Sequence, residues 1–305
     1  MSALDTQVRF RAFAFLEEQQ TIHGETLPYS LLLSGFQFEG TRVPLISPQG
    51  IFKPAVLDLP LSFWTTPIVE GQPRPYDDEL GDDGLIRYRY RGRDPQHQDN
   101  VGLRTCMERQ IPLIYLYGIV SGLYTPVWPV YIVGDDPGSL SFAVEVGDRT
   151  GLSVADDAWI ASDSQAKRAY TTVSTQRRLH QQSFRVRVIQ AYRKCCAICR
   201  LRHEELLDAS HILPDGHPRG EPWVSNGLAL CKLHHAAFDN NILGVRPDLI
   251  VEVRKDVLDE SDGPMLQHGL KECHEKRLLV LPISKGLKPR SDFLEERYEL
   301  FRSGR

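Results

Sequence analysis

The sequence predicts a two-domain α+β protein, with a curved, barrel-like β-sheet domain at the N-terminus and a metal-binding α+β domain at the C-terminus. The chain of 305 residues is long enough for two domains that each bury a core. Apolar and basic side chains begin to alternate near residue 85, which is typical of a strand. Cysteine and histidine pairs with metal-ligand spacing are confined to residues 196–239.

We assign residues 1–150 to the first domain. Apolar side chains at helical spacing predict an amphipathic helix over residues 5–22. Ile86, Tyr88 and Tyr90 alternate with arginines, which predicts a strand with one apolar and one basic face. The remaining predicted elements are a helix over 101–110 and strands over 113–117, 129–133 and 141–146.

Residues 151–178 lose this periodicity and become polar, so we predict a linker that contains at most a short helix. The second domain then covers residues 179–305. It begins with a basic helix over 179–194, and a strand is predicted to end at His211. Strands over 242–245 and 249–253 and a final helix over 290–302 complete it.

Composition sets limits on the class of protein. Hydrophobic residues make up 41% of the chain and charged residues 25%, which is ordinary for a globular protein. No apolar run approaches the roughly 20 residues that span a bilayer. The first residues lack the features of a signal peptide, and four of the six cysteines are crowded between Cys195 and Cys231, as in a metal site. We therefore expect a cytoplasmic protein with no membrane segment.

Charge is unevenly distributed, although the formal net charge is only −4. Between Arg177 and Arg202 there are eight basic residues and no acidic residue. Such a patch suits contacts with phosphate groups, and Arg185, Arg187 and Arg193 are its candidate DNA-binding residues. A solvated helix face is the alternative interpretation of the run.

Two short ligand pairs predict a structural Zn²⁺ site. Cys196-Ala-Ile-Cys199 places two thiolates on one face of a tight turn, and Cys231-Lys-Leu-His234 completes a tetrahedral set. Cys195 could replace Cys196, but its spacing to Cys199 fits a zinc knuckle less well. Two incidental cysteine pairs in a core are the alternative to zinc. A closed site of this kind has no open position for chemistry.

A second set of residues has the chemistry of phosphodiester hydrolysis, which needs an activated water and an ion that stabilises charge on the phosphate. A neutral His211 suits the role of general base, because a histidine pKa lies near working pH. Asn226 could bind and orient that imidazole. His235 and Asp239, four residues apart, share one helix face and can bind one divalent cation, Mg²⁺ or Mn²⁺.

These residues resemble the HNH, or ββα-metal, endonuclease family. The family pattern is a base histidine, an asparagine 15 residues on and a metal histidine about 9 further on. This chain has 15 residues from His211 to Asn226, 9 to His235 and 4 more to Asp239. The segment Asn226-Gly-Leu-Ala-Leu-Cys-Lys-Leu-His-His-Ala-Ala-Phe-Asp239 is similar to zinc-bearing members. The resemblance, over residues 180–250, implies that His211 is the general base, Asn226 its orienter, and His235 and Asp239 the catalytic metal ligands.

Three details leave alternatives open. Many relatives have Asp or His immediately before the base, where this chain has Ser210, so the metal has fewer protein ligands. His234 and His235 could exchange roles, although the Cys-x2-His spacing and the nine-residue step favour His234 for zinc. Asp239 could be an ordinary helix carboxylate in a salt bridge.

The first domain contains a run of hydrogen-bonding groups directly after a strand. Together with aromatic side chains, these groups predict a pocket for a flipped base. The candidate pocket residues are Trp64, Tyr88, Tyr90, Asp94, His97 and Asn100. The order of elements resembles an SRA-like or PUA-like modified-base reader, and the whole chain resembles modification-dependent (type IV) restriction endonucleases. The alternatives are that the aromatic residues fill a sheet core and that the polar ones form a turn.

The hypothesis that follows is a metal-dependent DNA endonuclease that recognises modified cytosine by base flipping and hydrolyses phosphodiester bonds. Its partner is double-stranded DNA. Because one ββα site cuts one strand, double-strand cleavage implies a homodimer or two successive nicks. Two alternatives remain: a zinc-stabilised nucleic-acid-binding module without cleavage, and an HNH nuclease toxin or RNA-cutting nuclease.

Overall fold

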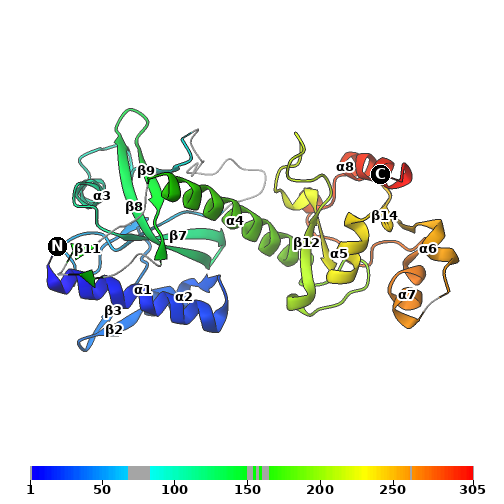
Figure 1. The fold of residues 1–305 in the computed structure, drawn as a ribbon, viewed down its shortest axis with the longest axis horizontal. Coiled ribbons are helices and arrows are strands. Elements are labelled where there is room, and N and C mark those ends of the chain that lie inside the picture. Colours follow the sequence, from blue (N-terminus) through cyan, green and yellow to red (C-terminus); the bar gives the residue numbers. More distant parts are fainter. Residues whose placement is uncertain are drawn as a thin grey trace. The chain divides into compact units, whose positions relative to one another are not determined.

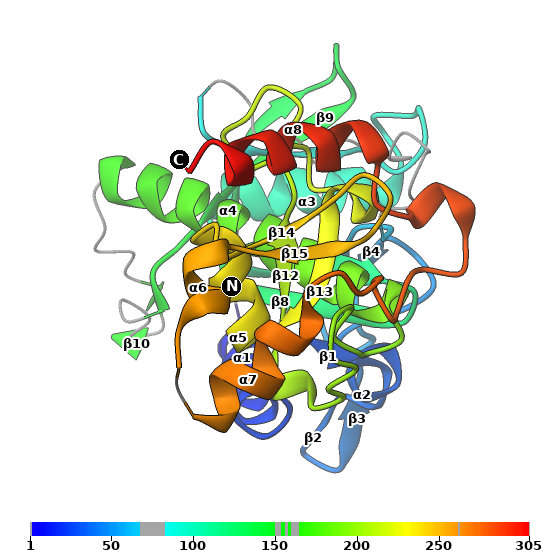
Figure 2. The same cartoon turned by 90° about the vertical axis from the view of Figure 1, so that its right-hand side faces the viewer.

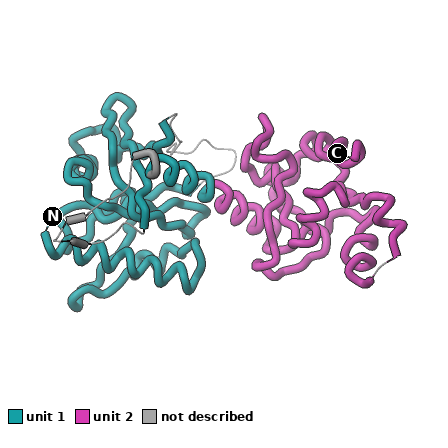
Figure 3. Tube along the Cα trace, in the orientation of Figure 1, with its two compact units in different colours: residues 1–179 teal, residues 180–305 magenta. Residues whose placement is uncertain are grey.

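A computed structural model describes residues 2–67, 83–149, 154–155, 158–159, 165–261 and 263–304 (Figure 1). The chain divides into two compact units, residues 1–179 and residues 180–305 (Figure 3). The division falls inside helix α4 (Gln165–Ala191), so one helix contributes residues to both units. Each unit is described by itself below.

The first unit contains a curled, open β-sheet of seven strands in the order β4-β5-β7-β8-β9-β6, with β1 paired to β8. The pair β5–β7 is parallel and the other pairs are antiparallel. Register shifts in the β7–β8 and β8–β9 pairs bend the long central strands, as β-bulges do. The strands are β1 (Leu27–Pro28), β4 (Ile51–Phe52), β5 (Ser62–Trp64), β6 (Ile86–Arg89), β7 (Leu113–Val120), β8 (Leu123–Asp136) and β9 (Ser141–Val146).

Helix α1 (Ala3–His23) packs its apolar face into the core of this unit, where Val8, Ala12 and Leu16 are fully buried. The helix begins at Ser2, whose hydroxyl accepts a hydrogen bond from the Asp5 backbone as an N-cap. The other described elements of the unit are α2 (Tyr29–Ser34), the β2–β3 hairpin (Phe36–Phe38 and Thr41–Val43), α3 (Gln98–Glu108) and the β10–β11 pair (Val154–Ala155 and Ala158–Trp159).

The second unit is built on an antiparallel pair of strands followed by a helix: β12 (Leu207–His211), β13 (Gly227–Cys231) and α5 (Lys232–Asp239). Helix α5 lies beside both strands (Figure 2). Leu228 and Leu230 of β13 are fully buried in the core that the end of α4 also enters. The remaining helices and strands are β14 (Leu243–Val245), β15 (Val251–Val253), α6 (Lys255–Asp259), α7 (Pro264–Gly269) and α8 (Ser291–Arg302).

Most predicted elements are confirmed, with shifted ends. The helix predicted over 5–22 is α1, and the strand predicted over 141–146 is β9 with the same bounds. The basic helix predicted over 179–194 is longer, because α4 begins at Gln165 inside the predicted linker. Much of residues 151–164 lies outside the described part of the chain. Across the described residues, no helix is long and apolar enough to cross a membrane.

Candidate functional site

The register of β12 and β13 brings the predicted ligands together in the second unit. Leu207 pairs with Cys231 at one end of the two strands, and His211 pairs with Gly227 at the other. Helix α5 starts directly after Cys231, so its first turn carries His234 and His235. The strand pair and the helix therefore form a ββα scaffold that holds one group of ligands at each end.

Cys196, Cys199, Cys231 and His234 form a cluster whose donor atoms all lie within 4.8 Å of one another. Sγ of Cys231 is 3.1 Å and Sγ of Cys196 is 3.5 Å from Nδ1 of His234, and the Sγ atoms of Cys199 and Cys231 are 3.9 Å apart. Cys195 lies outside the cluster, with its Sγ 3.2 Å from the Arg193 carbonyl.

The cluster fits a tetrahedral metal ion. With bond lengths of about 2.0–2.3 Å, the donors around a tetrahedral zinc lie about 3.5–3.8 Å apart, close to the separations found here. Nε2 of His234 lies 2.8 Å from the Gly269 carbonyl, which fixes the proton on Nε2 and leaves the Nδ1 lone pair facing the thiols.

His235 and Asp239 form a second pair on the same helix. Nε2 of His235 lies 3.1 Å from Oδ2 of Asp239, and Oδ1 of Asp239 accepts a hydrogen bond from the Ser210 hydroxyl at 3.4 Å. Adjacent ligands of an octahedral Mg²⁺ are about 2.9 Å apart when the bonds are about 2.0–2.1 Å long. The pair therefore has the donor types and the spacing to hold one edge of such an ion. The hydrogen bond to Asp239 raises the pKa of His235, although burial opposes it.

Asp208, which the sequence analysis did not select, lies on the other side of His235. Its Oδ2 is 3.4 Å from Nδ1 of His235, and the same carboxylate is paired with Lys232 and Arg185. Burial raises the pKa of Asp208, but the hydrogen bonds from Lys232, His235 and Arg185 outweigh it and keep the pKa below its usual value. Asp208 is therefore a charged carboxylate at neutral pH.

His211 lies at the end of β12 with its ring stacked on Phe184 of α4, at a centroid separation of 3.9 Å and an interplanar angle of 16°. Its Nε2 is buried and has no hydrogen-bond partner among the described residues. Burial lowers the pKa of His211, and the nearby charges of Asp215 and Asp239 only partly oppose this. His211 is therefore neutral at pH 7 and can accept a proton.

Asn226 is fully buried, but it does not have the arrangement expected from the sequence. Its Oδ1 accepts a hydrogen bond from the Leu213 backbone at 2.9 Å, and its Nδ2 donates to the carbonyls of Leu213 and Glu221 at 3.0 and 3.1 Å. These bonds use the side-chain amide to fix the loop after His211. Asn226 thus positions the backbone around the imidazole instead of binding the imidazole itself.

An open cavity of about 730 Å³ connects these groups. His211, His235 and Asp239 all line it, together with Asp208 and Arg185.

Arg297, from the last helix, also lines this cavity and was not foreseen. Its guanidinium donates to the Phe238 carbonyl at 2.6 Å and to Asn241, so it holds the end of α5 beside Asp239.

The three arginines predicted to contact DNA are in different environments. Arg193 is exposed. Arg185 is half-buried and donates to the carbonyls of Glu204 and Leu207 in addition to its pairing with Asp208. Arg187 is only 7% exposed, and its guanidinium donates to the Pro222 carbonyl at 2.7 Å. The prediction for Arg187 is therefore corrected: it packs inside the unit, where its charge is not available to a phosphate.

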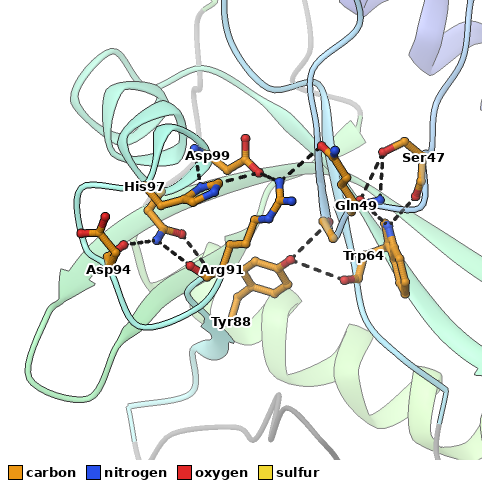
Figure 4. Close-up of polar contacts among 10 residues, drawn as sticks. Ser47, Gln49, Trp64, Tyr88, Arg91, Asp94, His97 and Asp99 are labelled. Carbon is orange, nitrogen blue, oxygen red and sulfur yellow. Dashed lines mark hydrogen bonds and ion pairs between the residues drawn. The ribbon is translucent and has the colours of Figure 1, made fainter.

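The first unit contains a separate pocket of about 290 Å³ beside β5 and β6, lined by aromatic and polar residues that include Gln49, Trp64, Thr65, Tyr88, Tyr90 and Arg91. The Trp64 indole N–H donates to the carbonyls of Ser47 and Gln49 at 3.0 and 2.7 Å, and the Tyr88 hydroxyl donates to the Gly50 carbonyl at 3.2 Å (Figure 4). Both rings are therefore held in fixed positions. Arg91 links two segments around the pocket, because its guanidinium binds Gln49 at 3.3 Å and also Asp99.

The predicted pocket residues separate into two groups. Trp64, Tyr88 and Tyr90 line the pocket, whereas the three polar candidates build the neighbouring loop. His97 caps helix α3 by accepting from the Asp99 backbone, Asp94 accepts from the Gln96 backbone, and the fully buried Asn100 bonds to the Arg91 backbone. Asp94, His97 and Asn100 are thus corrected to structural residues, as local hydrogen bonding of such side chains explains.

Comparisons with known proteins agree with the arrangement in the second unit. Residues 196–246 match a family model described as HNH endonuclease. Among solved structures, the chain is similar to one described as "Modification dependent TagI restriction endonuclease", with 16% identity over 79% of this chain and 81% of that chain and a TM-score of 0.29. No curated protein matches the chain. The functional inference therefore rests on the family match and on the geometry of the site.

Proposed function

We propose that this chain, which carries an HNH endonuclease domain over residues 196–246 and is therefore a nuclease, is a metal-dependent DNA endonuclease. The observation that supports this most directly is the shared cavity of the second unit. There a neutral His211 and the His235–Asp239 pair line the same space, so a base and a cation-binding edge face one substrate.

His211 accepts the proton of the attacking water. Its lowered pKa keeps the imidazole neutral at working pH, and Phe184 holds the plane of the ring. Asn226 keeps the loop after His211 in place, so the base does not need to reorganise when DNA enters.

His235 and Asp239 hold the catalytic cation, Mg²⁺ or Mn²⁺, which when bound supplies positive charge that stabilises the phosphate in the transition state. Arg185 and Arg297 line the same cavity and add positive charge near the phosphate. Burial lowers the pKa of Arg297. The guanidinium nevertheless remains charged, because the ordinary pKa of arginine is very high.

Cys196, Cys199, Cys231 and His234 hold a structural Zn²⁺. All four positions of a tetrahedral ion are taken by protein donors, so this ion does no chemistry. Its role is to tie the turn at residues 196–199 to the first turn of α5, and this fixes the helix that carries His235.

The pocket between Trp64 and Tyr88 receives a flipped base, and we propose a modified cytosine as its ligand. A small pocket with two fixed aromatic rings and a few polar groups suits a single base, which gains stacking energy there. Arg89 lines the same pocket and supplies a cation for the DNA backbone. Two chains, or two successive nicks, would then cut both strands of the duplex.

The experiment is a cleavage assay on matched duplexes that carry cytosine, 5-methylcytosine, 5-hydroxymethylcytosine or glucosylated 5-hydroxymethylcytosine, with Mg²⁺ or Mn²⁺. We expect cleavage of a duplex with one modified cytosine and no cleavage by His211→Ala. Equal cleavage of all four would refute the base reader and retain the nuclease. Failure to cut any DNA while RNA is cut would refute the DNA assignment.

A further inference from the structure

Asp208 lies where it can control which nitrogen of His235 carries the proton. Its Oδ2 is 3.4 Å from Nδ1 of His235, and on the opposite side of the ring Nε2 lies 3.1 Å from Oδ2 of Asp239. Each nitrogen of this imidazole therefore faces a different carboxylate. Asp208 belongs to β12 and Asp239 to the last turn of α5, so the two carboxylates are placed independently.

The strand and the helix match in spacing. Asp208 and Ser210 are two apart on β12, a separation of about 6.6 Å along a strand. His235 and Asp239 are four apart on α5, a separation of about 6 Å along a helix. Asp208 therefore meets His235 while Ser210 meets Asp239, as the two hydrogen bonds at 3.4 Å record. The match gives each member of the His235–Asp239 pair its own partner on the strand.

A histidine can bind a metal ion only through a nitrogen that carries no proton, so the proton must lie on the other nitrogen. In the His235 ring, a proton on Nδ1 is stabilised by the Asp208 carboxylate and leaves the Nε2 lone pair beside Asp239. With a cation beside Nε2 and Asp239, the reverse tautomer would place a lone pair against the negative charge of Asp208. It would also turn the N–H toward the place of the cation.

We propose that Asp208 is a positioning residue that accepts the Nδ1–H of His235 and thereby directs Nε2 toward the divalent cation. The proposal rests on the proposed function in one respect, because it takes His235 and Asp239 as the ligands of that cation. Asp208 is not one of the catalytic candidates that the sequence indicated.

The competing explanation is that Asp208 serves only to anchor Lys232 and Arg185, which both pair with it. Two variants separate the explanations. Asp208→Asn keeps an oxygen that can accept the Nδ1–H but has no charge to hold the two cations. Lys232→Ala removes a cation and leaves the Asp208 carboxylate in place.

The test measures the tautomer of His235 and the affinity for Mn²⁺, both in zinc-loaded protein. Nitrogen NMR of ¹⁵N-histidine-labelled protein reports the protonated nitrogen. It is recorded without Mn²⁺ in an Asp239→Ala background, at a pH where His235 is neutral, because Asp239 otherwise competes for the proton through Nε2. The His235 signals are assigned by their loss in His235→Gln. Calorimetric titration then gives the Kd for Mn²⁺. Asp215→Asn, which changes another acid that lines the same cavity, is the matched control.

We expect His235 to carry its proton on Nδ1 in the Asp239→Ala background and to populate the second tautomer when Asp208→Ala is added. The Kd for Mn²⁺ should rise roughly 10- to 100-fold in Asp208→Ala, as is usual when the outer partner of a metal-binding histidine is lost. Asp208→Asn should recover much of both properties. Lys232→Ala and Asp215→Asn should leave both unchanged.

An unchanged tautomer in Asp208→Ala would overturn the proposal, and so would an equal loss of Mn²⁺ affinity in Lys232→Ala. A failure of the proposed function has a different signature. In that case the wild type binds no Mn²⁺ at His235, while the tautomer measured without Mn²⁺ still decides the role of Asp208.

Discussion

His234 and His235 are neighbours in helix α5 but present opposite ring nitrogens to their partners. Nδ1 of His234 faces the thiols of the cysteine cluster at 3.1 and 3.5 Å, whereas Nε2 of His235 faces Asp239 at 3.1 Å. Successive helix residues point about 100° apart, so one turn of helix serves both sites. Damage to the zinc cluster should therefore reach the catalytic pair through the same turn.

This coupling leads to a prediction for Cys199→Ser. Loss of one thiolate should lower the zinc content from one ion per chain and destabilise the second unit by about 4 kcal/mol or more, the range typical of a lost metal site. Metal analysis and thermal unfolding measure the two effects. Cys195→Ser, a change at a cysteine outside the cluster, should leave the zinc content unchanged. A zinc-free variant that is fully stable and active would exclude the structural role.

The lowered pKa of His211 predicts the pH profile of cleavage. Because burial favours the neutral imidazole, kcat/KM at saturating Mg²⁺ should fall only below the ordinary histidine pKa of about 6.5 and should be level from about pH 7 upward. The profile is measured with a DNA substrate at constant ionic strength. An acid limb centred well above pH 6.5 would contradict a buried, neutral base.

The same shift affects stability. The unfolded chain takes up a proton at His211 near pH 6.5, whereas the folded protein does so only at lower pH. The contribution of His211 to the free energy of unfolding is therefore present above about pH 6.5. It is lost as the pH falls toward the pKa of His211 in the folded protein. The difference in unfolding temperature between wild type and His211→Phe, followed from pH 8 to pH 5, should change in that direction.

Gly227 tests the packing behind the base. A Cβ at this position would lie 2.6 Å from Val188 and 2.9 Å from Phe184, the ring that stacks on His211. The backbone of Gly227 is ordinary, with φ of −131°, so Gly227→Ala changes packing alone. We expect a loss of about 1–3 kcal/mol in stability and slower cleavage, because overpacking moves Phe184. Gly216→Ala, where a Cβ meets open space, is the control.

In the first unit, Trp64→Ala should weaken binding to modified DNA without affecting the metal centres. Loss of one stacked aromatic ring costs about 1–3 kcal/mol, or roughly 5- to 150-fold in Kd. Trp64→Phe retains a ring and should recover part of the affinity. Tyr170→Ala, at a tyrosine that is 76% exposed, should have no effect. Equal affinity of folded Trp64→Ala for modified and unmodified duplexes is the expected pattern in a fluorescence binding assay.

The sequence pointed to the four residues of the Cys/His cluster and to the His235–Asp239 pair because the spacing within each short motif is local. A Cys-x2-His pair and an i, i+4 pair lie within one or two turns of chain, so the same residues are neighbours in the fold. Asp208 and Arg297 were missed because their roles arise only when a distant strand or helix packs against α5. The sequence did contain one indication of the role of Asp208. It lies two residues before Ser210 on the strand that ends at His211, so both side chains lie on the same face of that strand.

The errors in the sequence analysis have related causes. Arg187 is part of a basic run, but its side chain is buried. A run of charges does not indicate which face of the helix packs against the core. Asp94, His97 and Asn100 have the polar character of a binding loop, yet they satisfy nearby backbone groups. Alternation predicted several strands of the sheet, but not their order, which depends on pairings between distant residues.

The central claim is that His211 is the general base of a metal-dependent nuclease. The most direct measurement is nicking of plasmid DNA by zinc-loaded wild type and His211→Ala, with and without Mn²⁺, beside His203→Ala as an exposed histidine control. We predict that the wild type cuts only when Mn²⁺ is present, and that His211→Ala loses roughly 10²- to 10⁴-fold in rate while it stays folded and binds DNA as the wild type does. Cutting by His211→Ala at the wild-type rate would contradict the account.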